Sequence, residues 1–436
     1  MIDLYEAGDY AQGITLAEKW VKQQNVSRQE DIYPLVYYYI AYGYQNLHGK
    51  ENTEQTNHYM TVYVTLGENA VADGCFPHRT EDYIVLKSLA EDYYLDMVYY
   101  YLGCLLYDRR AYGEAIADYE EAARRYPNFP TVHRNLALAY YNVKKLPQRA
   151  YEEMEKAFAL DETDARVYLE LDQLKKRLNV AVKERWSDME KHFDLVESRD
   201  DLYLEYVTLL NTLGEPEKAL GLIKARKFHQ WEGGEGKVAA QYLIALYQLA
   251  KAAVAKEDYA EAKELLLRAV DEYPHNLGEG KLESAQENNL YYLLGLVQEK
   301  LGEAKDAFES LTRACCGESE PVGMMYYNDQ PPEMIYYQGL AYRMLGEEEQ
   351  AVSRFQKLVD YGREHIRDDV KIDYFAVSLP DLLIFEENLN ERNRKHCLFM
   401  MSLGLKGLGR IDEAEKCAEE LLAVDNAHQE IRVHDL

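Results

Sequence analysis

One stretch, residues 96–129, limits the fold of this chain more than any other. It reads "DMVYYYLGCLLYDRRAYGEAIADYEEAARRYPNF", with apolar residues at spacings of three and four through two segments that "DRRAYGE" separates. This pattern is typical of amphipathic helices. Gly103 and Ala115 are small where two helices would approach closely, and Pro127 ends the unit because proline cannot continue a helix interior. The stretch therefore predicts a pair of packed helices.

The same arrangement returns along the chain. Clear copies begin at "YLIALYQLAKAAV" (242–254), "NLYYLLGLVQEKLG" (289–302), "MIYYQGLAYRMLG" (334–346) and "LGRIDEAEKC" (408–417), and weaker copies lie at 130–163 and 200–227. We count roughly nine helix pairs, some of them degenerate. One pair cannot bury its own apolar face, so neighbouring pairs must stack around a continuous core. The expected fold is an all-α solenoid.

The unit at 96–129 resembles the tetratricopeptide repeat position by position. That resemblance implies helix-turn-helix repeats stacked into a right-handed α-solenoid. We expect degenerate helical repeats in 1–95, tetratricopeptide-like repeats in 96–225, and similar repeats with long loops on one edge in 226–436. The first residues, "LYEAGDYAQGITLAEKW" (4–20), read as the second helix of a unit that has almost no first helix. Such a beginning is what an excised piece of a longer protein would show.

A more specific resemblance covers about residues 75–436. Runs such as "CFPHRTEDYIVLKSL", "FHQWEGGEGKVAAQY" and "KIDYFAVSLPDLLIFEENLNERNRKHC" are similar to a group of large bacterial repeat proteins. In those proteins a helical region follows a β-rich N-terminal domain of unknown function, which is loosely associated with carbohydrate metabolism. That domain is absent from this sequence, so the resemblance implies none of its activity for this chain.

The charge of the chain restricts its partners. A net charge of −28 disfavours nucleic acids and anionic lipid, which both attract clustered Lys and Arg. The N-terminus lacks the basic and apolar regions of a signal peptide, and no run of about twenty apolar residues could span a membrane. The six cysteines show no CxxC spacing and are expected to be free thiols in a reducing cytoplasm.

Four long connections distinguish the C-terminal half: 226–236, 273–286, 317–332 and 367–381, the first two of which include Gly-Glu-Gly before a lysine. Insertions at the same point of each repeat emerge along one edge of a solenoid, and long loops are often functional. The candidate ligand-binding residues in and beside these loops are His229, Trp231, Glu235, Lys237, His275, Asn276, Glu279, Lys281, Tyr326, Tyr327, Asn328, Asp329, Asp373 and Tyr374.

These loops have two interpretations, and the sequence leaves both open. Aromatic rings with amides and carboxylates suit a pocket for a sugar or a peptide segment. Alternatively, the loops pack on each other and seal the edge, with the glycines allowing close approach. A nucleotide phosphate loop is excluded, because Trp231 and His275 stand where its first glycine is required, and neither lysine precedes Ser or Thr.

A second candidate surface follows the first helices of the repeats. In the tetratricopeptide register, the residues expected to face the concave groove are Tyr38, Tyr100, Tyr247, Tyr292, Tyr336 and Phe399. The chain has 39 Tyr against 10 Phe, and tyrosine is enriched at interfaces because its ring buries while its hydroxyl stays hydrogen-bonded. The alternative is that these rings pack between helices with the hydroxyl at the rim.

Catalytic patterns are not found. The sequence has no HExxH, CxxC, GxSxG or dinucleotide fingerprint, and its 11 histidines are scattered. We therefore expect no enzyme activity, no cofactor and no metal site. The predicted function is a non-enzymatic scaffold that recognises a protein segment through the aromatic groove or the loop edge. The alternative is a carbohydrate-linked module whose loops bind a glycan, alone or within a larger carbohydrate-active protein.

Overall fold

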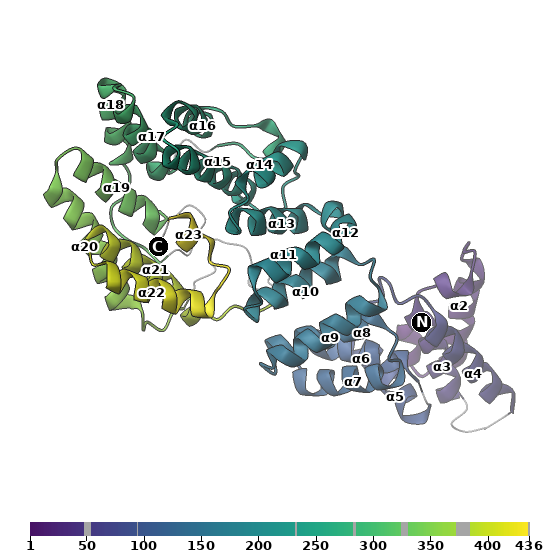
Figure 1. Ribbon diagram of the computed structural model, residues 1–436. Helices are drawn as coiled ribbons and strands as arrows, with labels where there is room; N and C mark the ends of the chain where they lie inside the picture. Colours follow the sequence, from purple (N-terminus) through teal and green to yellow (C-terminus); the bar gives the residue numbers. More distant parts are fainter. Residues whose placement is uncertain are drawn as a thin grey trace. The chain divides into compact units, whose positions relative to one another are not determined.

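The computed structural model describes residues 1–47, 54–93, 95–231, 233–281, 285–323, 330–371 and 384–434, and these residues form helices and no strand (Figure 1). The predicted all-α class is confirmed. The chain divides into two compact units, Met1–Glu162 and Thr163–Leu436. The predicted regions 1–95, 96–225 and 226–436 distinguish kinds of repeat rather than packing units, and they stay predictions.

The first unit consists of one short leading helix and a series of longer ones. Their bounds are α1 (Ile2–Glu6), α2 (Tyr10–Gln23), the 3-10 turn η1 (Gln29–Asp31), α3 (Pro34–Leu47), α4 (Glu54–Asn69), α5 (Thr80–Asp92), α6 (Met97–Asp108), α7 (Tyr112–Arg125), α8 (Pro130–Asn142) and α9 (Pro147–Leu160). Neighbours α3 and α4, α6 and α7, and α8 and α9 pack as pairs.

The second unit continues the series. Its elements are α10 (Ala165–Arg177), α11 (Val182–Lys191), α12 (Phe193–Ser198), α13 (Asp200–Thr212), α14 (Pro216–Ala225), α15 (Lys237–Ala255), α16 (Tyr259–Asp271), η2 (His275–Leu277), α17 (Asn288–Lys300), α18 (Ala304–Ala314), α19 (Pro332–Met344), α20 (Glu348–His365), α21 (Leu389–Gly407), α22 (Ile411–Val424) and α23 (Gln429–Val433). The pairs here are α10 with α11, α13 with α14, α15 with α16, α17 with α18, α19 with α20, and α21 with α22.

Small residues set the close packing inside the pairs, as the sequence predicts. A Cβ atom on Gly103 of α6 would lie 2.5 Å from the ring of Tyr119 on α7, and one on Gly295 of α17 would lie 2.7 Å from Leu311 on α18. Both distances are too short for a non-bonded contact. The glycines therefore make room for the large side chain of the second helix, which would otherwise force the pair apart.

The turns inside eight of the pairs share a backbone conformation. Eight turns, each following a first helix, contain a residue with positive φ. Four are glycines with φ of 75–82° and four are other residues with φ of 55–61°: Gly214, Gly302, Gly346 and Gly409, then Arg110, Lys145, Asn179 and Glu257. A left-handed residue ends the first helix and reverses the chain so that the second helix packs back on it. The backbone conformation of the turn therefore identifies the repeat even where its sequence pattern has degenerated.

A buried ion-pair cluster joins three helices at the start of the second unit. Arg185 of α11 has a fully buried side chain and donates to both carboxylate oxygens of Asp172 on α10, at 3.0 and 2.6 Å. It also donates to Glu205 of α13 at 2.7 Å. Burial of charges costs free energy unless they are paired, so this cluster fixes the mutual register of the three helices.

Helix α15 is the one described helix that is long and apolar enough, by length and composition, to span a membrane. Half of its apolar window is buried in the structure, as in the core helix of a stack, and it packs on α14 and α16. All six cysteines are free: Cys75 and Cys397 are buried, Cys316 is exposed, and the other three are half-buried.

Candidate functional site

The C-terminal segment of the second unit lies against the first helices of that unit. We call residues 423–434 the tail; it includes the end of α22, a turn, and α23. Figure 1 shows α23 among α13, α19 and α21 rather than stacked at the end of the series, and α13 contacts it. Three groups of contacts hold the tail there.

The first group closes the unit upon itself. The amide of Asn426 donates to Asn179 Oδ1 at 2.8 Å, and the Asn426 side-chain amide donates to the Asn179 carbonyl at 2.6 Å. Asn179 in turn donates to the carbonyl of Ala423 at 3.1 Å. Because Asn179 is the left-handed turn residue after α10, the first helix pair of the unit is bonded to the segment that comes after the last pair.

The second group is an amide network around Gln429. Nε2 of Gln241 on α15 lies 2.8 Å from Gln429 Oε1, and Gln429 Nε2 lies 3.2 Å from Gln241 Oε1. Gln429 also donates to the carbonyl of Thr208 and the hydroxyl of Thr212 on α13, both at 3.2 Å. Buried amides need such partners, so this network selects a glutamine at that position of the tail.

The third group combines apolar burial with capture of the main chain. Ile431 and Val433 are 1% and 2% exposed. Lys251 of α15 donates to the Val433 carbonyl at 2.7 Å, and Lys406 of α21 donates to the His434 carbonyl at 3.3 Å. The tail is therefore bound through two apolar anchors and through backbone carbonyls that any sequence would present.

The residues that hold the tail form one surface, which we call the inner face. They come from the turn after α10 and from α13, α15, α19 and α21, each the first helix of a pair: Asn179, Thr208, Thr212, Gln241, Tyr247, Lys251, Tyr337, Phe399 and Lys406. In a stack of helix pairs, the first helices share a side, and here a segment of the same chain occupies it.

Two of the predicted groove aromatics touch the tail. The Tyr247 ring lies 6.1 Å from the His434 ring, and the Phe399 ring lies 5.2 Å from that of His428. Tyr292 and Tyr336 pack against Tyr337, with their rings 5.5 and 5.3 Å from the Tyr337 ring. The Tyr337 hydroxyl in turn bonds to His434 of the tail. In the first unit, Tyr38 is fully buried with its hydroxyl donating to Glu68 at 2.7 Å, and Tyr100 packs its ring edge-on to Phe129 at 4.9 Å. The binding role of these rings stays a prediction.

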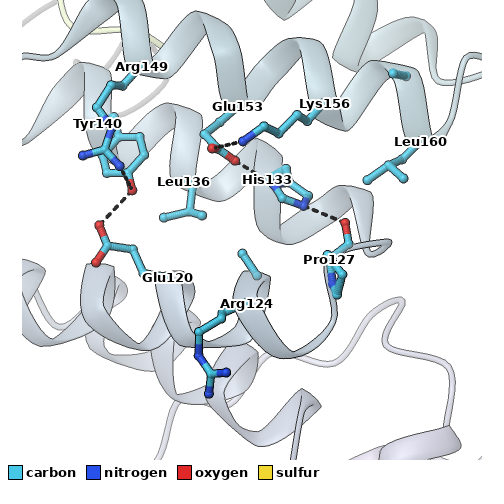
Figure 2. A pocket seen from close by; sticks show the side chains of 12 residues that line it. Glu120, Arg124, Pro127, His133, Leu136, Tyr140, Arg149, Glu153, Lys156 and Leu160 are labelled. Carbon is cyan, nitrogen blue, oxygen red and sulfur yellow. Dashed lines mark hydrogen bonds and ion pairs between the residues drawn. The ribbon is translucent and has the colours of Figure 1, made fainter.

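A groove of about 830 Å³ lies between α7, α8 and α9 of the first unit (Figure 2). His133 on its floor is 2.6 Å from Glu153 through Nδ1 and 2.9 Å from the Pro127 carbonyl through Nε2. The hydrogen bond with Glu153 raises the pKa of His133, which favours the charged imidazolium. Glu153 also pairs with Lys156 at 2.6 Å. The side chains of His133, Glu153 and Lys156 are thus already hydrogen-bonded or ion-paired within the groove.

Comparison with known families identifies the repeat. Residues 100–165 and 247–321 match one model described as a tetratricopeptide repeat, and residues 333–361 match a second. The chain contains tetratricopeptide repeats. The matched residues fall on α6–α9 and on α15–α20, where the structure has the helix pairs, and an α-solenoid of tetratricopeptide type is therefore the fold.

Solved structures resemble this chain only distantly. PilW, a type IV pilus biogenesis factor, is 13% identical over 53% of this chain and 92% of its own, with a TM-score of 0.30. Human IFIT1, solved as a dimer with m7Gppp-AAAA, is 12% identical over 97% and 88%, with a TM-score of 0.30. The tetratricopeptide domain of P58(IPK) is 12% identical over 79% and 96%, with a TM-score of 0.25. Likenesses of this size carry no information about a ligand. The predicted relation to bacterial proteins with a β-rich domain has no counterpart in these matches.

The first two long loops of the tetratricopeptide stack pack on each other. The Phe228 amide donates to the Asn276 carbonyl at 2.9 Å, and the Asn276 side chain caps the end of α14 by donating to Ile223 and Arg226 at 2.7 and 2.8 Å. The carboxylate of Glu279 accepts from the amides of Gly236 and Ala239 at 2.7 and 3.1 Å, at the start of α15. A carboxylate suits that end of a helix.

The duplicated Gly-Glu-Gly-Lys thus has a structural explanation: the glutamate of the second copy caps the helix that the lysine of the first copy begins. Lys281 pairs with Glu287 at 2.6 Å, and His229 with Asp200 at 3.1 Å. Trp231 is half-buried, while Glu235, Lys237 and His275 are exposed. These are the positions from which a ligand role would still be available.

The remaining loop candidates, Tyr326, Tyr327, Asn328, Asp329, Asp373 and Tyr374, lie outside the described residues. The described ends of their two loops meet, since Gly323 and Asp368–Lys371 line one pocket of about 540 Å³ with α20, α21 and the tail. His396 in that pocket is 2.8 Å from the Val322 carbonyl through its Nε2. The described parts of the third and fourth loops therefore meet, as do those of the first and second.

Sequence reasoning missed the tail. Its apolar anchors alternate, in "QEIRVH" (429–434), and the segment is too short to show a helical period. Its one available signal was position: the last repeat-like pattern ends at 422, and a polar and apolar segment comes after it.

Proposed function

We propose that this chain is a non-enzymatic scaffold that binds a short segment of another protein on the inner face, and that its own tail holds this face until a partner replaces it. Tetratricopeptide stacks are typically protein-interaction scaffolds, which supports the general class. The single observation that carries the specific proposal is the way the tail is held, because it has the components of a peptide complex.

Those components predict the partner. Lys251 of α15 and Lys406 of α21 capture main-chain carbonyls whatever the sequence, which gives affinity. Specificity comes from Asn426, Gln429, Ile431 and Val433, whose partners are buried or paired. A protein segment with the pattern Asn-x-x-Gln-x-Ile-x-Val would reproduce every one of these contacts.

The tail suits replacement because little of it is self-supporting. Helix α23 has five residues, and a helix of that length is unstable alone, so the inner face supplies its stability. A tethered segment acts at an effective concentration on the order of millimolar. A free partner must therefore bind the inner face more tightly than the tail does, and weak or unrelated segments are excluded.

The glycan alternative has less support from the described loops. Asn276 and Glu279 are used to cap α14 and α15, which removes two of its polar candidates. Half-buried Trp231 remains the aromatic platform that this alternative would need. We place the protein in the cytoplasm, where six free thiols stay reduced.

The test uses a labelled peptide of residues 423–434 and the full chain with Ile431→Asp, which puts a charge at a 1% exposed position and releases the tail. In fluorescence anisotropy, the Ile431→Asp chain should bind the peptide, whereas the unaltered chain should bind it weakly or not at all. Adding Gln241→Ala to the Ile431→Asp chain should weaken the binding about fivefold or more, since it removes the hydrogen bonds to Gln429.

A folded Ile431→Asp chain that ignores the peptide would refute the proposal. A thermal-shift screen against oligosaccharides, with Trp231→Ala as control, tests the alternative: a shift that Trp231→Ala abolishes would establish a glycan site.

A further inference from the structure

Three potential metal ligands meet where the tail ends. They are Glu333 at the start of α19 and Glu430 and His434, which are four residues apart on the tail. One ligand atom of each lies within 4.8 Å of the other two. His434 Nε2 is 3.1 Å from Glu430 Oε2. The cluster thus joins the tail to the inner face through side chains that all carry lone pairs.

Glu333 has no counter-charge of its own. It is 8% exposed, and no other described residue donates a hydrogen bond to its carboxylate. Glu430 is the second carboxylate of the cluster, and its ligand atom lies within 4.8 Å of that of Glu333. A buried carboxylate next to a second carboxylate requires a cation or a proton, because like charges at this distance cannot both ionise unaided.

The orientation of His434 suits a cation in the tautomer that carries its proton on Nδ1. Its Nδ1 is 2.9 Å from the Tyr337 hydroxyl, which is 2.7 Å from the hydroxyl of Tyr247. When Nδ1 donates this hydrogen bond, the lone pair of the imidazole is on Nε2, which faces the carboxylates. Metal-bound histidines are held in this way, by a hydrogen bond from the ring nitrogen that does not bind the metal.

We propose that Glu333, Glu430 and His434 bind a divalent first-row transition ion of the Zn²⁺ class, which fastens the tail to α19. One imidazole nitrogen and two carboxylate oxygens are a ligand set that Zn²⁺ accepts, with water in the fourth position. Ligand atoms on one tetrahedral Zn²⁺ are about 3.3 Å apart, so the side chains close by about 1.5 Å at most as the ion binds. Binding releases the protons that the ligands carry.

If the tail is the occupant of the inner face, as the proposed function holds, this ion acts as its latch. Two of the three ligands are on the tail and the third is on α19, so all three can bind one ion only while the tail is docked. By linkage, it stabilises the docked state and opposes the partner. Removal of the ion would then release the tail for exchange.

The experiment uses the untagged full chain stripped of metal, with Zn²⁺ alone as the probe and millimolar Mg²⁺ present to occupy unspecific acidic sites. Competition with a chromogenic chelator should give one tight site per chain. Glu333→Gln, which preserves side-chain shape, and His434→Gln, which removes the imidazole, should each weaken it at least tenfold. His229→Gln should leave it unchanged, because the His229 side chain is 79% exposed and pairs with a different carboxylate, that of Asp200.

Hydrogen exchange locates the site. Zn²⁺ should slow exchange of the amides of 429–434 in the unaltered chain and leave them unchanged in Glu333→Gln. The proposal is overturned if no stoichiometric Zn²⁺ binds, or if both glutamine variants bind it as the unaltered chain does. Peptide binding by the Ile431→Asp chain needs no metal, so failure of the latch is distinguishable from failure of the proposed function.

Discussion

Replacing Ile431 with alanine tests whether the tail is a docked segment or an integral part of the core. The side chain is 1% exposed, and Ile→Ala at a buried site costs about 2–5 kcal/mol. If the tail is docked, this loss acts on its local opening rather than on global unfolding. A loss of about 2 kcal/mol raises the open population about 30-fold.

Native-state hydrogen exchange measures this directly. The His434 amide, which donates to the Glu430 carbonyl at 3.0 Å, should exchange at least about 30-fold faster in Ile431→Ala, since its bond exists only in the docked tail. Amides in the interior of α17 should keep their protection. The matched control is Ile411→Ala, the same change at a position that is 46% exposed, where the effect should stay within about 0.5 kcal/mol. Equal loss of protection in α13, α19 and the tail would refute the reasoning, because the tail would then open only with the whole unit.

Three further predictions concern the scaffold. Arg185→Met leaves a buried carboxylate without its cation and should cost about 3–5 kcal/mol in urea denaturation, whereas a change of less than about 1 kcal/mol would contradict the pairing. The His133 pKa is raised in the folded state, so its pair with Glu153 stabilises most below about pH 6.5 and loses this contribution as pH rises through the raised pKa. The melting-temperature advantage over Glu153→Gln should therefore be larger at about pH 6 than at about pH 9; a constant advantage would contradict this. Gly278→Ala should cost about 1–3 kcal/mol by thermal denaturation, because φ there is +82° and a Cβ would lie 2.7 Å from a carbonyl of the neighbouring loop; an unchanged melting temperature would show that the loop relaxes freely.

The fold could be predicted because its information is local. A helix pair needs apolar residues at helical spacing, a small residue opposite a large one, and a left-handed turn, and all three fall within about 34 residues. Gly103 and Tyr119 show this, since their contact follows from the register of one unit. Stacking then follows from the need to cover each exposed apolar face.

The occupant of the inner face could not be predicted in the same way. Asn179 and Asn426 bond to each other because many small rotations between successive pairs bring the ends of the unit together. The rotation between successive repeats is set by details of side-chain packing, and these cannot be read from a residue pattern. The proximity of Glu333 and His434 could not be predicted for the same reason, because the whole of α20–α22 separates them in the chain. The choice between the two interpretations of the loops likewise depended on one contact, that of Glu279 with the start of α15. This contact depends on how two repeats stack, so the sequence left both interpretations open.

The tail also explains an apparent contradiction between the sequence and the structure. A groove lined by tyrosines should be exposed if it waits for a partner, yet Tyr247 and Tyr337 are 3% and 4% exposed. Their hydroxyls are joined to each other at 2.7 Å, and that of Tyr337 to His434 at 2.9 Å, so the rings are buried by a segment that bonds to their polar ends. A dry core would be served as well by phenylalanine, which makes no such bond. Tyr337→Phe should therefore weaken docking of the tail while leaving the packing of α19 on α20 intact, and the exchange rate of the His434 amide separates these two effects.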